Sequence, residues 1–218
     1  MTHRLHRPLA IALLAAAPLA QAIGITDGRA DYVAGYAGST AGDLDVIGAF
    51  VTYNQGTGAF VLSGTMDADI GTTPGGFYVW GANRGAGTAG FSAQGFTNVL
   101  FDAVILVRQD GSVTVNRLGG GGSTVLPAGT AHITGATIDV LIPGGLLPST
   151  GFAPAGYTWN LWPRDGNLPG GFGQISDFAP DNSNFGATVI GTVPEPTSAL
   201  LLAAGIAGLV LRRRLSAR

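Results

Sequence analysis

Closely spaced aspartates are the residues of this chain whose type and spacing could do chemistry. They occur as Asp43 and Asp45, as Asp67 and Asp69, and as Asp177 and Asp181 within the stretch ISDFAPDNSN. Residues i and i+2 of a strand face the same side, so a D-x-D pair would bring two carboxylates together. Such groups repel one another unless a cation lies between them, and Ca²⁺ prefers oxygen ligands. We expect no cofactor by default; Ca²⁺ is the alternative, with Asp67, Asp69, Asp177 and Asp181 as its candidate ligands.

Two other interpretations of these aspartates stay open. Aspartate also favours turns by hydrogen bonding to its own backbone, and the stretch DADIG at 67–71 lacks the terminal glutamate of a calcium-binding loop. Paired carboxylates also hydrolyse glycosides, but no feature of the sequence raises the pKa of one acid above that of the other. A glycan-active enzyme is the most distant alternative.

Histidine chemistry is confined to one position of the expected exported chain. His3 and His6 lie in an N-terminal segment that we expect to be removed, which leaves His132 in the strand-like stretch AHITG. No G-x-S-x-G elbow accompanies it, and one histidine without cysteine cannot complete a usual zinc site. We predict a structural histidine, no catalytic residue and no enzymatic activity.

The stretch YTWNLWPRDG at 157–166 is a second candidate site. On a strand, Trp159 and Leu161 share a face that suits the core, which places Trp162 on the opposite face and predicts that it is exposed. An exposed indole beside Arg164 could stack on a sugar ring and bind its hydroxyl groups. Trp162 and Arg164 are therefore candidate ligand-binding residues. Edge packing is the alternative, because tryptophans are buried on average.

The elements that must position these side chains have the pattern of short strands. Residues 49–53 and 59–63 flank a glycine-containing turn, and a second hairpin is centred on Asp110 and Gly111, a dipeptide suited to a tight turn. Further strand candidates are 32–36, 77–82, 131–134, 137–142, 157–162 and 186–190. Many short strands with frequent turns predict an all-β fold, an antiparallel β-sandwich of the jelly-roll kind. We interpret the GGGGS stretch at 119–123 as a loop within one domain.

Composition supports a domain without disulfides. Of 218 residues, 36 are glycine and none is cysteine, which indicates many turns and a stability that depends on the core or on bound ions. Residues 23–192 contain five arginines, no lysine and twelve aspartates, a formal charge of −7. This excess of negative charge disfavours a nucleic-acid partner.

The N-terminus has the pattern of a secretory signal peptide. Residues 1–22 contain two early arginines, an apolar run and the small-x-small sequence formed by Ala20 and Ala22 around a glutamine. Cleavage is expected after Ala22. We therefore predict a signal peptide at 1–22, a β-sandwich domain at 23–192 and a separate C-terminal segment at 193–218.

The C-terminal segment has three parts in a fixed order. These are the sequence Val193, Pro194, Glu195 and Pro196, then an apolar run at 198–211, then Arg212, Arg213 and Arg214. As a helix the run would cover about 21 Å, which is short for a permanent span of a bilayer core about 30 Å thick. The arginines would stay on the cytoplasmic side and leave the domain outside.

This segment resembles the PEP-CTERM sorting signal of Gram-negative bacteria in all three parts. The resemblance implies that an exosortase recognises the Pro-Glu-Pro box, removes the tail and delivers the protein to the cell surface or extracellular matrix. Proteins with this signal generally accompany exopolysaccharide and biofilm production. A simple C-terminal membrane anchor is the alternative.

These observations predict an exported, exosortase-sorted protein with a structural or adhesive role in an exopolysaccharide or biofilm matrix. The expected partners are an exosortase, the membrane during export and sorting, and exopolysaccharide. The alternative function is a carbohydrate-binding or calcium-binding module of the matrix.

Overall fold

The computed structural model describes residues 24–191 and 205–206. These residues form an antiparallel β-sandwich, which confirms the predicted all-β fold class. The predicted signal peptide and almost all of the predicted sorting helix lie outside the described residues. None of the helical segments in the described ranges has the length and hydropathy needed to cross a bilayer.

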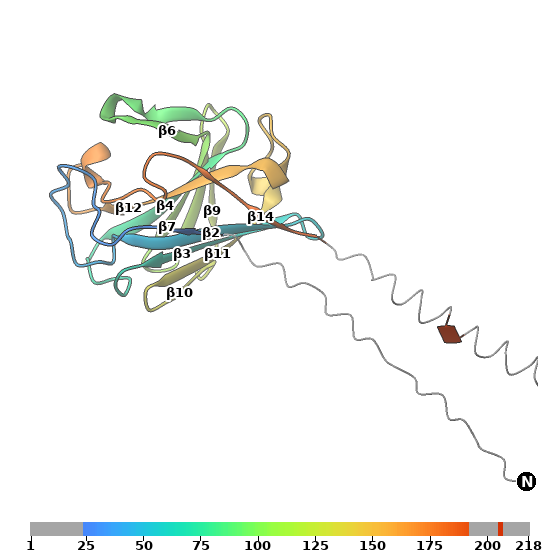
Figure 1. Cartoon of the computed structure of the whole chain (residues 1–218), viewed down its shortest axis with the longest axis horizontal. Helices are drawn as coiled ribbons and strands as arrows, with labels where there is room; N and C mark the ends of the chain where they lie inside the picture. The colour runs from blue at the N-terminus through green and yellow to red at the C-terminus, as the bar shows by residue number, and fades with distance from the viewer. Residues whose placement is uncertain (1–23, 192–204, 207–218) are drawn as a thin grey trace, which may run out of the picture.

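Two six-stranded sheets face each other, and a two-stranded hairpin lies over one of them (Figure 1). Sheet A contains β1 (Ile25–Thr26), β2 (Val46–Asn54), β3 (Ala59–Met66), β11 (Thr137–Pro143) and β10 (Ala131–Thr134) in that order, with β14 (Thr188–Ile190) also paired to β2. Sheet B contains β13 (Phe185–Gly186), β12 (Thr158–Asp165), β4 (Gly76–Asn83), β7 (Ala103–Arg108), β8 (Val113–Arg117) and β9 (Gly122–Leu126). The hairpin is formed by β5 (Thr88–Phe91) and β6 (Phe96–Phe101).

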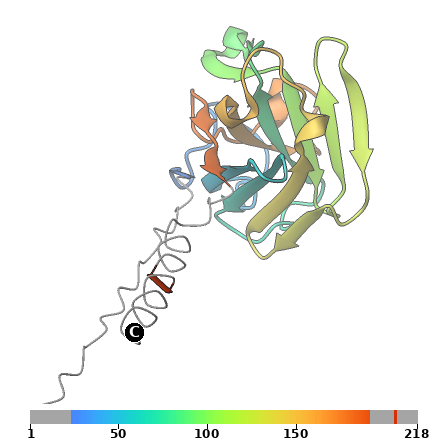
Figure 2. The ribbon, with the colours of Figure 1, turned by 90° about the vertical axis from the view of Figure 1, so that its right-hand side faces the viewer.

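Short 3₁₀ turns connect several strands. They are η1 (Ser92–Gln94), η2 (Gly144–Leu146), η3 (Pro154–Gly156) and η4 (Phe172–Gln174). Figure 2 shows the sandwich from the side, where the yellow-green hairpin of β8 and β9 follows one edge of the molecule.

The main core lies between the two sheets and follows the alternation of each strand. In β11, Ile138, Val140 and Ile142 are buried while the intervening residues face outward. In β12, Trp159 and Leu161 point into the same core from the opposite sheet. Period-2 burial of this kind is what a half-buried strand requires, so the apolar residues themselves specify which side of each strand faces inward.

A second core lies on the outer side of sheet B. The aromatic side chains of the β5–β6 hairpin and of η4 cover the outward-facing residues of β4, β7 and β12. Its members include Val79, Val99, Trp162, Ile175 and Phe178. The central strands of sheet B are therefore covered on both faces, which explains why β4 and β12 contain almost continuous runs of buried residues.

Both predicted hairpins are confirmed by the strand pairings of β2 with β3 and of β7 with β8. Gly111 lies at the tight turn of the second hairpin with a φ of 77°, a conformation that costs glycine little. The stretch 119–123 spans the turn between β8 and β9 and the first residues of β9. The strand predicted at 32–36 is wrong, because this segment has no sheet partner and instead forms a turn in which the Tyr36 amide donates to the Val33 carbonyl.

The two ends of the described domain share one edge of β2. β1 pairs antiparallel with Gly48 and Ala49, and β14 pairs parallel with residues 52–54 farther along the same strand. A shallow hollow is lined by residues of both ends, including Ile25 and Val189. Segments more than 160 positions apart in the sequence are therefore neighbours in space.

Candidate functional site: an aspartate cluster

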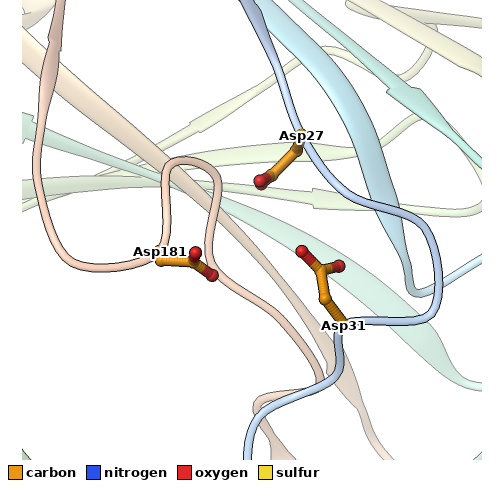
Figure 3. A group of neighbouring side chains, drawn as sticks. All are labelled: Asp27, Asp31 and Asp181. Atoms are coloured by element: carbon orange, nitrogen blue, oxygen red, sulfur yellow. The ribbon is translucent and has the colours of Figure 1, made fainter.

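Five aspartates from three separate segments meet at one end of the sandwich. Their carboxylates form two overlapping groups. The outer triad is Asp27, Asp31 and Asp181, and the inner triad is Asp31, Asp45 and Asp177; within each triad the nearest carboxylate oxygens all lie within 4.8 Å of one another. Figure 3 shows the three carboxylates of the outer triad directed toward a common space between two loops. We call these five residues the aspartate cluster.

Backbone contacts hold the inner carboxylates in place. Asp45 immediately precedes β2, and its Oδ2 accepts a hydrogen bond of 2.7 Å from the Ala30 amide. The Ala30 backbone adopts a left-handed φ of 57°. Asp177 Oδ2 accepts from the Val46 amide at 2.8 Å, and its Oδ1 accepts from the Phe178 amide at 2.7 Å. The loop 27–31, the start of β2 and the segment before β13 are thus connected through carboxylates.

The surroundings of the cluster oppose negative charge. Burial raises the pKa of Asp177 to about 8 against the opposing hydrogen bond from the Val46 amide, and repulsion from Asp27 and Asp31 adds to the increase. Burial also raises the pKa of Asp27 to about 6, reinforced by neighbouring aspartates including Asp181. Burial is also the main cause that raises the pKa of Asp45. Burial is the largest cause of all three increases, because it penalises the charged form of a carboxyl group.

Two oxygens of the cluster have no hydrogen-bond partner. Asp45 is 1% exposed, and its Oδ1 is buried without a donor. Asp27 Oδ2 is also buried and has no hydrogen-bond donor. Arg29, in the same loop as Asp27 and Asp31, forms an ion pair with Asp67 outside the cluster. A buried carboxylate oxygen without a donor is costly, because folding has removed its water without replacing it.

The cluster contains only part of the predicted metal-ligand set. Asp177 and Asp181 both belong to it, in different triads. Asp67 and Asp69 do not, since both lie in the turn after β3 and Asp69 is exposed. The expectation that D-x-D pairs lie on strands and share a face is wrong for this pair and for Asp43 and Asp45, because both pairs occupy turns.

Three members of the cluster were not among the predicted ligands. Asp45 belongs to a D-x-D pair with Asp43, but Asp43 lies outside the cluster and accepts hydrogen bonds of 2.6 Å from the amide and the hydroxyl of Thr73. Asp27 and Asp31 frame the pentapeptide DGRAD, which has acids at both ends of a glycine-containing loop. That pattern was the available signal, although nothing in it shows that the loop meets residues 177–181.

The predicted sugar-binding residues lie elsewhere, on the outer side of sheet B. The prediction that Trp162 is exposed is wrong: it is 2% exposed and packs against Phe91, Phe101 and Phe178 in the second core. Its indole faces are therefore covered by protein. Trp162 is therefore a packing residue, as the alternative interpretation of edge packing expected.

Arg164 is held by its neighbours on the same side of the sheet. Its Nη2 donates to the Gly171 carbonyl at 2.7 Å, and its guanidinium lies 5.9 Å from the centre of the Phe77 ring. Burial lowers the pKa of this guanidinium. Trp162 and Arg164 do line a common apolar hollow of about 340 Å³ together with Leu106.

His132 lies on β10 with an exposed side chain. Its Nε2 is 3.1 Å from Thr134 Oγ1, and Asp139 occupies the opposite position on β11. Among the described residues the ion pairs are Arg29 with Asp67 and Arg84 with Asp102. Asp139 is therefore a sheet neighbour of His132 and not an ion-pair partner.

Comparison with known proteins decides the identity of the C-terminal segment. The tail is a PEP-CTERM protein-sorting motif. The match covers residues 192–214, which include the Pro-Glu-Pro box, the apolar run and the three arginines. The PEP-CTERM motif marks this chain as an exported protein sorted by an exosortase. No curated protein and no solved structure matches the chain.

Proposed function

We propose that the sandwich domain is a structural or adhesive component of an extracellular exopolysaccharide matrix and that it has no enzymatic activity. The observation that carries this proposal is the PEP-CTERM motif at 192–214, attached directly to the end of a folded all-β domain. The apolar run of the motif would hold the protein in the membrane during export and sorting. Processing at the Pro-Glu-Pro box would then release the domain or transfer it to the surface.

The outer face of sheet A supports an adhesive role. Unlike sheet B, it has no hairpin above it, and its outward side chains form rows across neighbouring strands. One row contains Thr65, Thr137 and Thr134, and the next contains Asp139 and His132, while Ser63 beside Asp139 is buried. Rows of hydroxyl and other polar groups on a flat sheet suit hydrogen bonding to the hydroxyl groups of a polysaccharide chain.

The geometry around His132 supports a non-catalytic role. Nucleophilic hydrolysis needs a histidine between a nucleophile and an orienting acid. Across sheet A the order is Ser63, then Asp139, then His132, so the acid lies between the other two residues. This order places the serine two strands away from the only histidine in the described chain.

A cell-fractionation experiment tests the proposal. We compare wild-type cells, a strain that lacks the protein, and a variant in which Pro194, Glu195 and Pro196 are replaced by alanine. Mass spectrometry should find the wild-type protein in the matrix without its tail, and the variant in the envelope with its tail intact.

The same strains test the role of the domain. The matrix of the strain that lacks the protein should disperse more readily, and wild-type protein should restore its cohesion while the processing variant should not. A matrix of unchanged cohesion in the strain that lacks the protein would contradict the proposed function, whatever the fate of the tail.

A further inference from the structure

We propose that the aspartate cluster binds Ca²⁺, with Asp31 shared between the inner triad (Asp31, Asp45, Asp177) and the outer triad (Asp27, Asp31, Asp181). This inference is independent of the matrix function proposed above. It assigns a metal site to residues that are far apart in the sequence and of which only Asp177 and Asp181 were predicted ligands.

The spacing of the carboxylates fits calcium. Two oxygens bound to one Ca²⁺ at about 2.3–2.6 Å can lie as far apart as about 5 Å, whereas the shorter bonds of Mg²⁺ limit this separation to about 4 Å. The oxygens of each triad lie within 4.8 Å of one another. An ion equidistant from three oxygens at that upper limit would lie about 2.8 Å from each, so small side-chain movements bring all three acids of a triad to calcium bond lengths.

The ligand type also favours calcium. All five side chains are carboxylates, and neither histidine nor cysteine belongs to the cluster. Hard cations prefer such oxygen sets, while zinc and copper sites usually include nitrogen or sulfur ligands. The loop backbone and water can supply the remaining oxygens of a coordination number of six to eight.

A buried oxygen without a partner is the observation that separates this cluster from an ordinary acidic surface. Asp45 is 1% exposed, its Oδ2 is satisfied by the Ala30 amide, and its Oδ1 has no donor. This carboxylate belongs to the inner triad. A metal ion in the triad would supply the missing partner.

No arginine of the described residues forms an ion pair with Asp45, although Arg29 lowers its pKa through space against the larger effect of burial. The chain contains no lysine. Arg29, in the loop that carries Asp27 and Asp31, pairs with Asp67. The buried arginine Arg84 pairs with Asp102 at 2.9 Å. Five neighbouring acids therefore depend on a bound ion or on protons for charge compensation.

Calcium in this position would connect the two ends of the domain. Asp27 and Asp31 follow β1, whereas Asp177 and Asp181 precede β13. An ion bound by both segments closes a loop of about 150 residues, the kind of constraint that a disulfide provides in many exported proteins. This chain has no cysteine with which to form one.

Calorimetry and thermal unfolding test the site directly. The purified protein, stripped with EGTA, is titrated with CaCl₂ or MgCl₂. We expect calcium binding with a stoichiometry of one or two ions. At a free Ca²⁺ concentration about 100-fold above Kd, the unfolding midpoint should rise by about 5–10 °C. Absence of binding heat together with an unchanged midpoint would overturn the proposal.

Single substitutions distinguish the triads. Asp31→Asn should weaken binding most, because Asp31 belongs to both triads, while Asp181→Asn should affect only the outer triad. Asp69→Asn is the matched control, since Asp69 is an exposed turn aspartate outside the cluster. Circular dichroism of each stripped variant checks that it is folded.

Asp31 and Asp181 are both exposed, so neither substitution disturbs the buried core and both variants should fold. Calcium affinity equal to that of the wild type in both Asp31→Asn and Asp181→Asn would place the ion elsewhere and overturn the assignment. A loss of affinity by a factor of about ten or more in Asp31→Asn, with Asp69→Asn unchanged, would support it.

Discussion

At the scale of single residues, the most extensively bonded polar group of the fold is the ion pair of Arg84 and Asp102. Arg84 is 3% exposed, and its Nε donates to Asp102 Oδ1 at 2.9 Å. The Thr150 hydroxyl and the Ala86 amide donate to Asp102 Oδ2. The Arg84 guanidinium also donates to the Pro148 carbonyl. The pair therefore connects the end of β4, the start of β7 and the loop before η3.

Replacement of this acid should destabilise the fold strongly. Asp102→Ala leaves the Arg84 charge buried without its partner, which typically costs about 3–5 kcal/mol. Urea unfolding followed by tryptophan fluorescence measures the change in the free energy of unfolding. Asp110→Ala, in the exposed turn between β7 and β8, is the control and should have a much smaller effect. A loss below about 1 kcal/mol for Asp102→Ala would show that the pair is not a major stabilising contact.

The same carboxyl predicts a dependence of stability on pH. Burial by itself would raise the pKa of Asp102, but hydrogen bonds from Thr150 and Arg84 outweigh it and hold the pKa below its ordinary value. The folded state therefore binds this proton less readily than the unfolded state, whose carboxyl titrates near 3.9. The contribution is complete above about pH 4 and is lost as the pH falls through the folded-state pKa.

Comparison of the wild type with Asp102→Asn isolates this contribution. Both proteins contain the other acids with shifted pKa values, so the influence of these acids cancels in the difference. The difference between their free energies of unfolding should be constant from pH 6 to 5 and should narrow between pH 4 and 3. A difference that stays constant down to pH 3 would contradict a lowered pKa for Asp102.

Single residues also show where the sequence was insufficient. Alternation in YTWNLWPRDG correctly placed Trp159 and Leu161 in the main core. It placed Trp162 on the other face, which is also right, but it predicted that this face is open. The covering side chains, such as Phe91 and Phe101, come from a hairpin about 60–70 positions earlier. The alternation of residues within one strand cannot show that side chains from a hairpin far away in the sequence pack over one of its faces.

At the scale of elements, the β5–β6 hairpin is held by side chains that act in place of a neighbouring strand. Asn184 Oδ1 accepts from the Leu100 amide at 3.1 Å, and its Nδ2 donates to the Leu100 carbonyl at 2.7 Å. Asn182 makes the equivalent contacts with the Asn98 amide and the Gly95 carbonyl. The stretch ISDFAPDNSN thus combines two cluster aspartates with the asparagines that fix β6.

Asn184→Ala should therefore loosen the cover over the second core. The substitution leaves both backbone groups of Leu100 without these partners, at a cost of about 1–3 kcal/mol. Hydrogen exchange of the Leu100 amide should accelerate by a factor of about ten or more, while exchange within β3 and β11 should change much less. Ser183→Ala is a neighbouring control. Uniform acceleration across all strands would indicate global destabilisation and would contradict a local role.

Element prediction from sequence succeeded where hairpins are local. The β2–β3 and β7–β8 pairs have short turns with glycine, and their strands have clear alternation. It failed at 32–36, where two tyrosines stack on each other in a loop without pairing to a sheet. The aspartate cluster could be predicted only in part for the same reason, because its two loops meet through tertiary packing.

At the scale of the whole molecule, the ends of the domain protect the edge of sheet A. β1 covers the first half of the free side of β2, and β14 covers the second half. The Gln55 amide extends this contact by donating to the Ile190 carbonyl at 3.0 Å. The PEP-CTERM motif begins at residue 192, only two positions after β14. Removal of the tail at the Pro-Glu-Pro box would therefore leave the edge protection in place.

A pair of truncations tests this division of the chain. A chain that ends at residue 191 retains β14 and should unfold at nearly the same temperature as the full mature domain. A chain that ends at residue 187 loses the pairing of β14 with residues 52–54 of β2, which should cost about 2 kcal/mol and lower the unfolding midpoint by about 4–8 °C. An uncovered strand edge also offers a site for association with another copy, so this shorter chain should form dimers or larger species in analytical ultracentrifugation. If the two chains share one midpoint and both remain monomeric, β14 does not protect the sheet, and its place beside β2 is incidental to the stability of the domain.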